Sequence, residues 1–194
     1  MVDQDRGASR RALLGSVGAA LAGSAAVALG GCGQSAKTGH KAVKTASLPV
    51  RHVDVKLLGR SLEIERRTVA AYIAGIPLLS RSQGKAAKQF LNEELQHTGE
   101  LLALITASGA TPAPRAASYD IRGYPRDRTG VLALLHSLES AQIANYLTVI
   151  PSLSPGPVRA AVASILANDA QHVAILRLAQ GEPGLPSAFV TGRE

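Results

Sequence analysis

The sequence has few cysteine and aromatic residues, and these shortages exclude several classes of site. Its 194 residues include one cysteine, no tryptophan, four tyrosines and two phenylalanines. A single thiol excludes a disulfide within the chain and a metal site built from several thiolates. The scarcity of rings that could stack on bases argues against a nucleic-acid partner, although the formal net charge is +7. No stretch alternates between apolar and polar side chains as a half-buried strand would.

The sequence also lacks a long, strongly apolar run, although its first residues predict an export signal. The opening SRRALL contains Arg10 and Arg11, the paired arginines typical of a twin-arginine signal, and the weakly apolar run after them ends in LGGC. This pattern resembles the signal of bacterial lipoproteins, in which a cysteine becomes the acylated first residue. A transmembrane anchor or cleavage elsewhere is the alternative, but the many glycines make the run a poor membrane span. We predict that residues 1–31 are removed and that Cys32 is diacylated.

The predicted lipid would place the protein at a membrane. We expect an exported protein, anchored through acylated Cys32 to the outer face of the bacterial cytoplasmic membrane or in the periplasm. The formal charge of the chain stays positive after removal of residues 1–31, which favours an anionic membrane surface. A lipid membrane is therefore an expected partner, and nucleic acid is not.

After the predicted signal, the chain divides into a tether, a helical region and a tail. Residues 32–52 are polar and small without apolar periodicity, and are predicted to be a flexible tether. From residue 53 onward, apolar side chains recur every three or four positions, which is typical of helices packed in a bundle. We predict four helices, over about residues 53–76, 82–108, 128–150 and 154–180. Residues 181–194 are predicted to be an irregular tail.

The links between the predicted helices differ in length. Short links join the first helix to the second and the third to the fourth, so each pair is predicted to be antiparallel. Between the second and third helices lie residues 110–130, rich in Pro, Gly and Arg and long enough to travel the length of a bundle. The predicted fold class is therefore all-α: an antiparallel four-helix bundle over residues 53–180, with two helical hairpins joined by a long crossover.

The two predicted hairpins repeat each other in sequence. The stretch ERRTVAAYIAGIP, from Glu65, aligns with ESAQIANYLTVIP, from Glu139. The stretch FLNEELQH, ending at His97, aligns with ILANDAQH, ending at His172. Each half thus has a glutamate, a tyrosine seven residues later, and then an acid three residues before a histidine. The paired residues are Glu65 with Glu139, Tyr72 with Tyr146, Glu94 with Asp169, and His97 with His172.

The repeated acids and histidines fall at the apolar positions of their helices. Because these positions face the core, the pattern predicts that four carboxylates and two imidazoles converge inside the bundle. Ionised carboxylates in a core cost several kcal/mol each unless they are paired or bind a metal. A metal-free network of ion pairs is the alternative, but two histidines cannot balance four acids. We predict two metal ions bound by six ligands: Glu65, Glu94, His97, Glu139, Asp169 and His172.

This ligand set resembles that of the ferritin-like superfamily, which includes ferritins, bacterioferritins and rubrerythrins. In such bundles two helices each supply a glutamate, and the other two each supply Glu-x-x-His. The resemblance covers about residues 53–180, including the order of short link, long crossover and short link. It implies two ions of iron or manganese. Asp169 departs from the pattern by one methylene at a carboxylate that commonly bridges the metals, which leaves open an altered, weaker or empty second site.

Other polar residues lie near the predicted ligands in the sequence. Tyr72 and Tyr146 are predicted to be core tyrosines with satisfied hydroxyls, with a role beside the metals as the alternative. His136 takes an inward position one turn before a predicted ligand, where it is either a partly buried histidine or a further partner of the site. Glu63 and Glu93 lie off the apolar face and are predicted to be solvated surface charges.

Two functions are compatible with these residues. The resemblance implies a di-metal oxidoreductase of the ferroxidase or peroxidase type, with dioxygen or peroxide as the small oxidant. The alternative is a non-catalytic binding or scaffold lipoprotein with a degenerate metal site, which the departure at Asp169 favours. A homodimer is compatible with either function.

Overall fold

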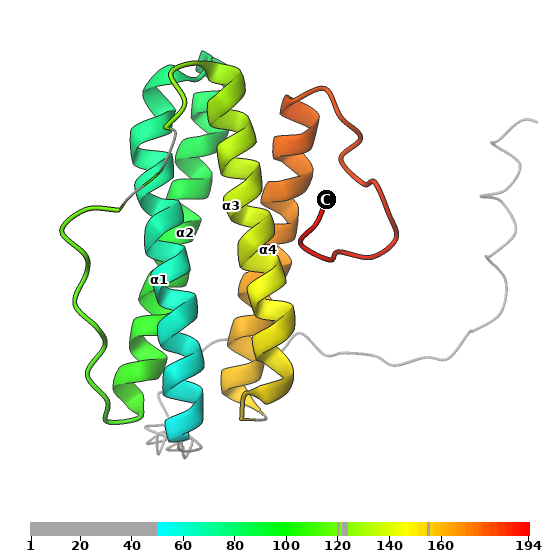
Figure 1. The fold of residues 1–194 in the computed structure, drawn as a ribbon. Coiled ribbons are helices and arrows are strands. Elements are labelled where there is room, and N and C mark those ends of the chain that lie inside the picture. The colour runs from blue at the N-terminus through cyan, green and yellow to red at the C-terminus, as the bar shows by residue number, and fades with distance from the viewer. Residues whose placement is uncertain (1–49, 120, 122–123, 155) are drawn as a thin grey trace, which may run out of the picture. The chain divides into compact units, whose positions relative to one another are not determined.

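The computed structural model describes residues 50–119, 121, 124–154 and 156–194 (Figure 1). Within these ranges the chain forms helices and no strand. The helices are α1 His52–Gly75, η2 Ile76–Leu78, α2 Arg81–Ala107, α3 Arg128–Val149, η3 Ile150–Ser152 and α4 Pro157–Ala179. The predicted all-α four-helix bundle is confirmed. The residues that carry the predicted export signal and lipid, Arg10, Arg11 and Cys32, lie outside the described ranges.

Each hairpin turns through a short 3-10 helix that contains a proline. Proline fits the first turn of a helix, where a backbone N–H has no intrahelical acceptor, and η2 and η3 both use it there. Ser80 then caps α2, because its hydroxyl accepts from Gln83 N and its own N–H donates to Gln83 Oε1. Before α4 the chain turns at Gly156, whose φ of 83° lies in the left-handed region that favours glycine.

The crossover runs along the outside of the bundle from the end of α2 to the start of α3 (Figure 1). Arg66 of α1 anchors it, since its Nη1 donates to the carbonyl of Ala113 at 2.9 Å. Asp127 ends the crossover and caps α3 by accepting from Gly130 N at 2.8 Å. The crossover therefore makes α2 and α3 run in the same direction, as the long link predicted.

Two apolar clusters fill the bundle, one on each side of its middle. One holds Leu58, Leu62, Leu101, Ile105 and Val162, near the start of α1. The other holds Ala71, Phe90, Leu132, Leu135 and Leu176, toward the opposite end. The buried acids Glu65, Glu94, Glu139 and Asp169 lie in the layer between the clusters. Helix α1 packs against α2 and α3, and α3 packs against α4, whereas α2 and α4 touch more sparsely.

After α4 the chain returns to the outer face of α3 without a further helix. Gly192 packs so closely that a Cβ there would lie 2.5 Å from the carbonyl oxygen of Ser140 and from the nitrogen of Ala144. Only glycine fits this contact, and the φ of 75° at Gly192 also favours it.

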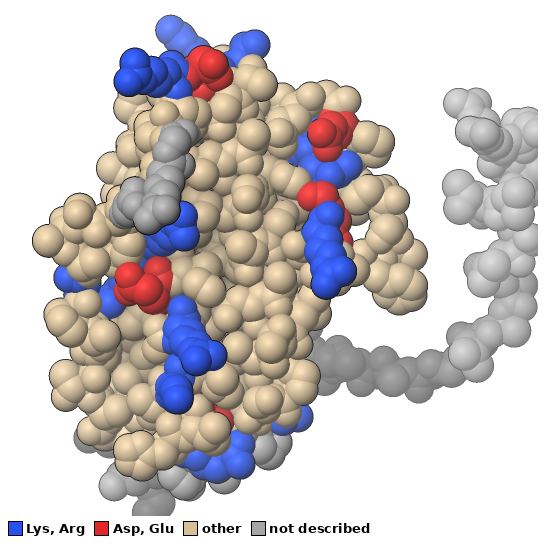
Figure 2. Space-filling model, viewed as in Figure 1, with Lys and Arg blue, Asp and Glu red and all other residues tan. Residues whose placement is uncertain are grey.

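The surface carries its charges in scattered groups. Figure 2 shows one face, on which basic and acidic side chains are separated by wide uncharged areas. Among the residues that the structure describes, no helix is both long enough and apolar enough to cross a membrane.

Candidate metal centre

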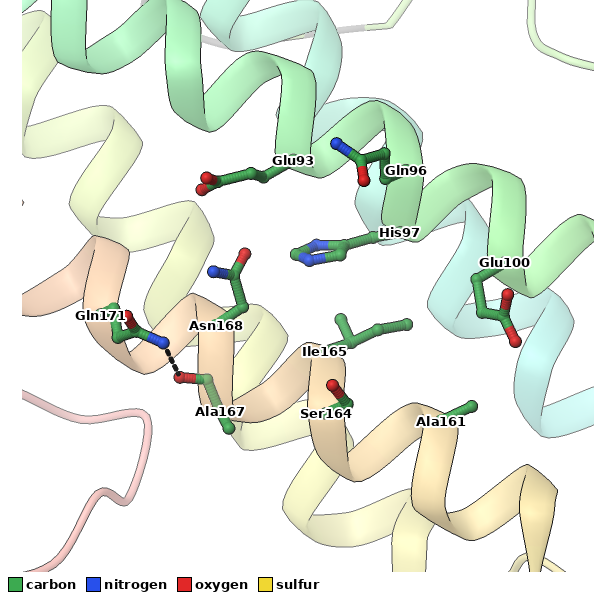
Figure 3. Close-up of a pocket in the computed structure, with 10 residues that line it drawn as sticks. All are labelled: Glu93, Gln96, His97, Glu100, Ala161, Ser164, Ile165, Ala167, Asn168 and Gln171. Carbon is green, nitrogen blue, oxygen red and sulfur yellow. Dashed lines mark hydrogen bonds between the residues drawn. The ribbon is translucent and has the colours of Figure 1, made fainter. Parts of the chain in front are cut away.

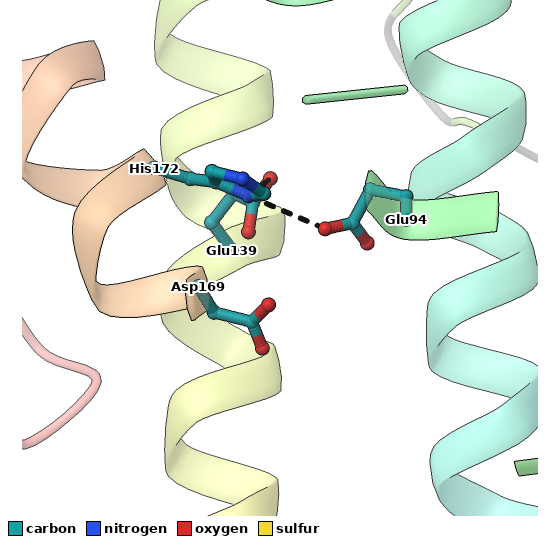
Figure 4. Close-up of side chains that lie close together, drawn as sticks. All are labelled: Glu94, Glu139, Asp169 and His172. Atoms are coloured by element: carbon teal, nitrogen blue, oxygen red, sulfur yellow. Dashed lines mark hydrogen bonds and ion pairs between the residues drawn. The ribbon is translucent and has the colours of Figure 1, made fainter. Parts of the chain in front are cut away.

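The six predicted ligands meet in the polar layer between the two apolar clusters. Glu65 and Glu139, one from α1 and one from α3, are fully buried. Helices α2 and α4 each add an acid and a histidine one turn apart, which places both groups on the same face of their helix. The exposed fractions are 0% for all four acids, 1% for His172 and 8% for His97. Figure 4 shows Glu94, Glu139, Asp169 and His172 pointing toward one another.

The ligand atoms form two overlapping groups, each within 4.8 Å. We call Glu94, Glu139, Asp169 and His172 the His172 half of the centre, and Glu65, Glu94 and His97 the His97 half. Glu94 belongs to both halves. Its Oε1 lies 3.3 Å from His172 Nδ1 and 3.4 Å from His97 Nδ1. Glu94 is therefore the carboxylate that would contact both ions if each half held one.

Several ligand atoms are buried without a hydrogen-bond partner among the described residues. They are Glu94 Oε1, Glu139 Oε2, both oxygens of Asp169, and His97 Nδ1. A buried polar atom left unpaired costs about 1–3 kcal/mol, and more if it is charged. Carboxylate oxygens and imidazole nitrogens are the donor atoms that iron, manganese and zinc accept. The unpaired atoms converge on one point, so the residues present fit the binding of cations.

Burial and mutual repulsion make most of the carboxyl groups hold their protons. Burial, together with the charge of Glu94, raises the pKa of Glu65 to about 8 and that of Glu139 to about 7. Burial and the charges of Glu65 and Glu139 raise the pKa of Asp169 well above its ordinary value. Burial also opposes ionisation of Glu94, but the close approach of the two histidines outweighs it and holds the pKa of Glu94 below the ordinary value.

The two histidines respond in the opposite way. Burial disfavours their charged forms, but the surrounding carboxylates outweigh it and raise the pKa of His97 to about 10 and of His172 to about 11. Without a cation, the centre is therefore neutralised by protons on imidazoles and carboxyls. A cation that binds there has to displace protons.

Comparison with known proteins agrees with this architecture. A family model described as a ferritin-like domain matches residues 53–182.

The chain belongs to the ferritin-like domain family.

Among solved structures, the chain is similar to a conserved hypothetical protein from Mycobacterium tuberculosis, with a TM-score of 0.63 and 17% sequence identity. The match covers 70% of this chain and 96% of that chain. At this identity the likeness shows the fold alone. No curated protein matches the chain.

The aspartate that departs from the ferritin-like pattern still reaches the centre. Asp169 is fully buried, and its Oδ1 lies 3.4 Å from His97 Nδ1. It belongs to the His172 half, whereas the His97 half has three ligand residues. Asp169 is thus one of four candidate ligand residues in the His172 half, one more than the His97 half has.

Both predicted tyrosines contact ligands across the bundle. Tyr72 of α1 donates to Glu139 Oε1 on α3 at 2.6 Å, and Tyr146 of α3 donates to Glu65 Oε1 on α1. Burial and these glutamate charges raise the pKa of both phenols well above the ordinary value. The tyrosines are thus core residues with satisfied hydroxyls, and each also orients one glutamate of the centre.

Glu93 is closer to the centre than the sequence predicted. Its side chain is 27% exposed, and its Oε2 lies 2.7 Å from His172 Nε2. Because His172 turns Nδ1 toward the carboxylates, its Nε2–H can donate to Glu93, the arrangement in which a carboxylate fixes the ring of a metal-binding histidine. The prediction of a solvated Glu93 was wrong, because α2 and α4 pack sparsely enough to let this side chain reach across. Glu63 is exposed, as predicted, at 53% of its side chain.

Gln142 is a contact of the centre that sequence reasoning missed. It is fully buried, and its Nε2 donates to Glu65 Oε2 at 2.7 Å and to Glu94 Oε2 at 2.8 Å. Its Oε1 accepts from Thr68 Oγ1 at 3.0 Å. The signal was present, since a polar residue stands one turn after Glu139 on the inward face of α3.

The structure does not bring His136 to the centre. The side chain is half-buried, and its Nε2 has no hydrogen-bond partner among the described residues. Burial and the nearby charge of Arg177 lower its pKa, and the acids Glu182 and Glu194 act weakly against this. His136 therefore faces α4 and the C-terminal tail, and corresponds to the partly buried histidine that was the other expectation for this position.

A groove of about 610 Å³ between α2 and α4 leads from the surface to the centre (Figure 3). His97 lines its inner end, and the acids Glu93 and Glu100 stand along its α2 side. Asn168 and Gln171 line the α4 side. The groove gives small polar solutes a path to the His97 half.

Proposed function

We propose that this ferritin-like domain binds two ions of iron or manganese and uses them in a reaction with dioxygen or peroxide. The observation that carries the proposal is the convergence of four buried carboxyl groups and two imidazoles whose free atoms have no partner among the described residues. Cations bound there would give these oxygens and the imidazole nitrogen of His97 the partners that they lack in the described part of the chain.

The residues divide between the two ions as the overlapping groups suggest. Glu139, Asp169 and His172 would hold one ion, Glu65 and His97 the other, with Glu94 between them. Bound there, a pair of ions that can change valence would supply the electrons that dioxygen or peroxide takes up. The five ligands other than His97 are at most 1% exposed, so the chain excludes bulk water from most of the centre.

The groove between α2 and α4 supports a small substrate. It reaches His97 and presents polar side chains, so hydrated cations, dioxygen and peroxide fit its size and chemistry. The tyrosine hydroxyls hold one oxygen each of Glu65 and Glu139 and leave the ligands aimed at the centre.

A single loading experiment tests this function. The purified chain is loaded with ferrous iron without oxygen, its iron is counted, and oxygen is then admitted while the absorbance of ferric iron is followed. Two irons per chain and a rise in absorbance are expected. A stable, colourless bundle without iron would instead favour the scaffold function, to which the aspartate at position 169 lends support.

We also propose that the protein is an exported lipoprotein, held at a membrane through Cys32. The support is the sequence alone: the arginine pair Arg10 and Arg11, the weakly apolar run and the LGGC that ends it. In a bacterial host, labelled fatty acid should be incorporated into the chain but not into the Cys32→Ser variant. Replacing both arginines with lysine should retain the chain in the cytoplasm, and export of that variant would contradict the proposed route.

A further inference from the structure

The repeat that builds the centre is broken at a buried position beside the ligands. Aligning ERRT with ESAQ places Thr68 of α1 opposite Gln142 of α3. The long amide of Gln142 reaches Glu65, which belongs to the His97 half alone, and Glu94, which both halves share. The short hydroxyl of Thr68 donates to Gln142 Oε1 or to the carbonyl of Ile64, and has no hydrogen bond to an acid among the described residues.

Thr68 also fixes which way the amide of Gln142 points. With Oε1 accepting from the Thr68 hydroxyl, both N–H bonds face the carboxylates. The reverse orientation would aim a carbonyl oxygen at two acids and leave the hydroxyl without that acceptor. The buried pair therefore delivers one donor to Glu65 of the His97 half and one to the shared Glu94.

The oxygens of the two halves consequently differ in how they are satisfied. In the His97 half, Glu65 accepts from Tyr146 on one oxygen and from Gln142 on the other. In the His172 half, Glu139 Oε2 and both oxygens of Asp169 accept no hydrogen bond from any described residue. Glu94 Oε1 also lacks a hydrogen bond from the described residues but is shared, so the oxygens that lack one and belong to a single half are all in the His172 half.

We propose that Gln142 makes the two halves of the centre unequal, so that the His172 half takes the first cation and the His97 half takes a second, weaker one. This inference rests on the proposed binding of two ions. In the His172 half, four ligand residues meet a cation with unpaired oxygens. In the His97 half, three ligand residues meet it, and a cation shares or displaces the hydrogen bonds of Gln142.

The position of the groove gives this order a consequence. His97 lines the inner end of the groove, whereas His172 is 1% exposed and lies behind Glu93. The weaker cation is therefore also the one beside the opening. It is the ion that exchanges with the surroundings, while the ion in the His172 half stays.

Titration with Co²⁺ tests the order, because Co²⁺ binding can be followed by absorbance and calorimetry without turnover. The wild-type chain should bind two Co²⁺ ions in two steps that differ at least about tenfold in affinity, the change expected from one hydrogen bond to a charged group. The His172→Ala variant should lose the tight step, and the His97→Ala variant should keep the tight step and lose the weak one. The opposite assignment would overturn the order.

The role of Gln142 is tested by giving it the side chain of its repeat partner. The Gln142→Thr variant frees Glu65 Oε2 and Glu94 Oε2, so its second step should tighten by about tenfold and approach the first. Gln180→Thr is the matched control, because Gln180 lies half-buried at the end of α4, does not line the groove, and donates through its side chain to the carbonyl of Leu176. The control should keep the gap between the steps, and thermal melting by circular dichroism checks that each variant is folded.

Each result decides a separate point. Equal steps in the wild type, or an unchanged gap in Gln142→Thr, overturn this inference and leave the proposed function standing. A wild-type chain that binds no Co²⁺ overturns the proposed function and this inference with it. If Gln142→Thr does not fold, Thr68→Val removes the hydroxyl that orients the amide, and should narrow the gap in the same direction by a smaller factor.

Discussion

In the first hairpin, α1 and α2 supply Glu65, Glu94 and His97, and in the second, α3 and α4 supply Glu139, Asp169 and His172. The ligand types are therefore duplicated, and so are the tyrosines that cross between the hairpins. The surrounding polar groups are not duplicated. The repeat-related positions at the centre that differ include Thr68 with Gln142, Glu93 with Asn168, and Glu94 with Asp169.

This comparison separates two kinds of requirement. The groups that would bind cations have to occur in both hairpins, because each half of the centre needs its own carboxylates and imidazole. The groups that donate to or accept from those ligands are free to differ, and Glu93 and Gln142 each have a contact that no repeat partner reproduces. A repeated fold can thus hold two chemically different halves at one centre.

The largest expected effect comes from the one ligand that both halves share. Glu94→Ala should abolish binding of both ions, because Glu94 belongs to both ligand groups. Elemental analysis after loading with Co²⁺ should fall from two ions per chain to none. Glu63→Ala, at an exposed site of α1, is the control and should retain both ions. Retention of one tightly bound ion in Glu94→Ala would show that Glu94 is not shared.

The second prediction concerns the pH dependence of the metal-free protein. The pKa of Glu65 is raised from 4.5 to about 8, and that of Glu139 from 4.5 to about 7. A raised pKa means that the folded chain binds the proton more tightly than the unfolded chain, so this stability is complete below pH 4.5 and is lost as the pH rises toward about 8. The melting temperature of the metal-free chain should therefore fall across that window.

Two comparisons sharpen the pH experiment. Glu94, with its lowered pKa, acts in the opposite sense, and its contribution is lost as the pH falls below its ordinary 4.5. The Glu65→Gln variant should show a smaller fall between pH 4.5 and about 8 than the wild type, because the titrating carboxyl is gone. Loading with metal should remove the fall, since cations replace the protons. A melting temperature that rises with pH in the metal-free chain would contradict the proton-filled centre.

A smaller effect is expected at the carboxylate behind His172. Glu93→Gln weakens the contact that holds the ring of His172, and such changes typically cost about 10–100-fold in metal affinity. The loss should fall on the tight step of the Co²⁺ titration. Asn168→Ala, at the repeat-related position, should change either step less than Glu93→Gln does. Equal losses of affinity in the two variants would mean that Glu93 supports the centre no more than its repeat partner Asn168 does.

The smallest effects are expected where the hairpins agree. Tyr72→Phe and Tyr146→Phe each remove one buried donor to a glutamate, which should lower the free energy of unfolding by about 1–3 kcal/mol. The two losses should be similar, because the contacts are equivalent. Urea denaturation of the metal-free chain measures both, and a large difference between them would break the symmetry inferred for this pair.

The helices and the six central residues could be predicted from the sequence because each signal was repeated. The spacing of apolar residues shows which face of a helix is inward. The alignment of the two hairpins then shows that each inward acid has an acid at the matching position of the other hairpin. The crossover followed from length alone, since about twenty residues can span a bundle and a few cannot.

The contacts around the ligands could not be predicted in the same way. Glu93 lies one position off the apolar face, and it reaches His172 only because α2 and α4 pack sparsely. Gln142 is uncharged, so its place on the inward face of α3 does not by itself require a charged partner. Its contacts with Glu65 and Glu94 are evident only from the distances in the structure. His136 had the right helical position, but its side chain faces α4 and the tail.

The two apolar clusters lie on either side of the acidic layer, one toward each end of the bundle. Their contacts are between apolar side chains and need no ion, so they hold the helices together whether or not the acidic layer contains a cation. The stability of the fold and the proposed binding of metal are thus assigned to different layers of one bundle.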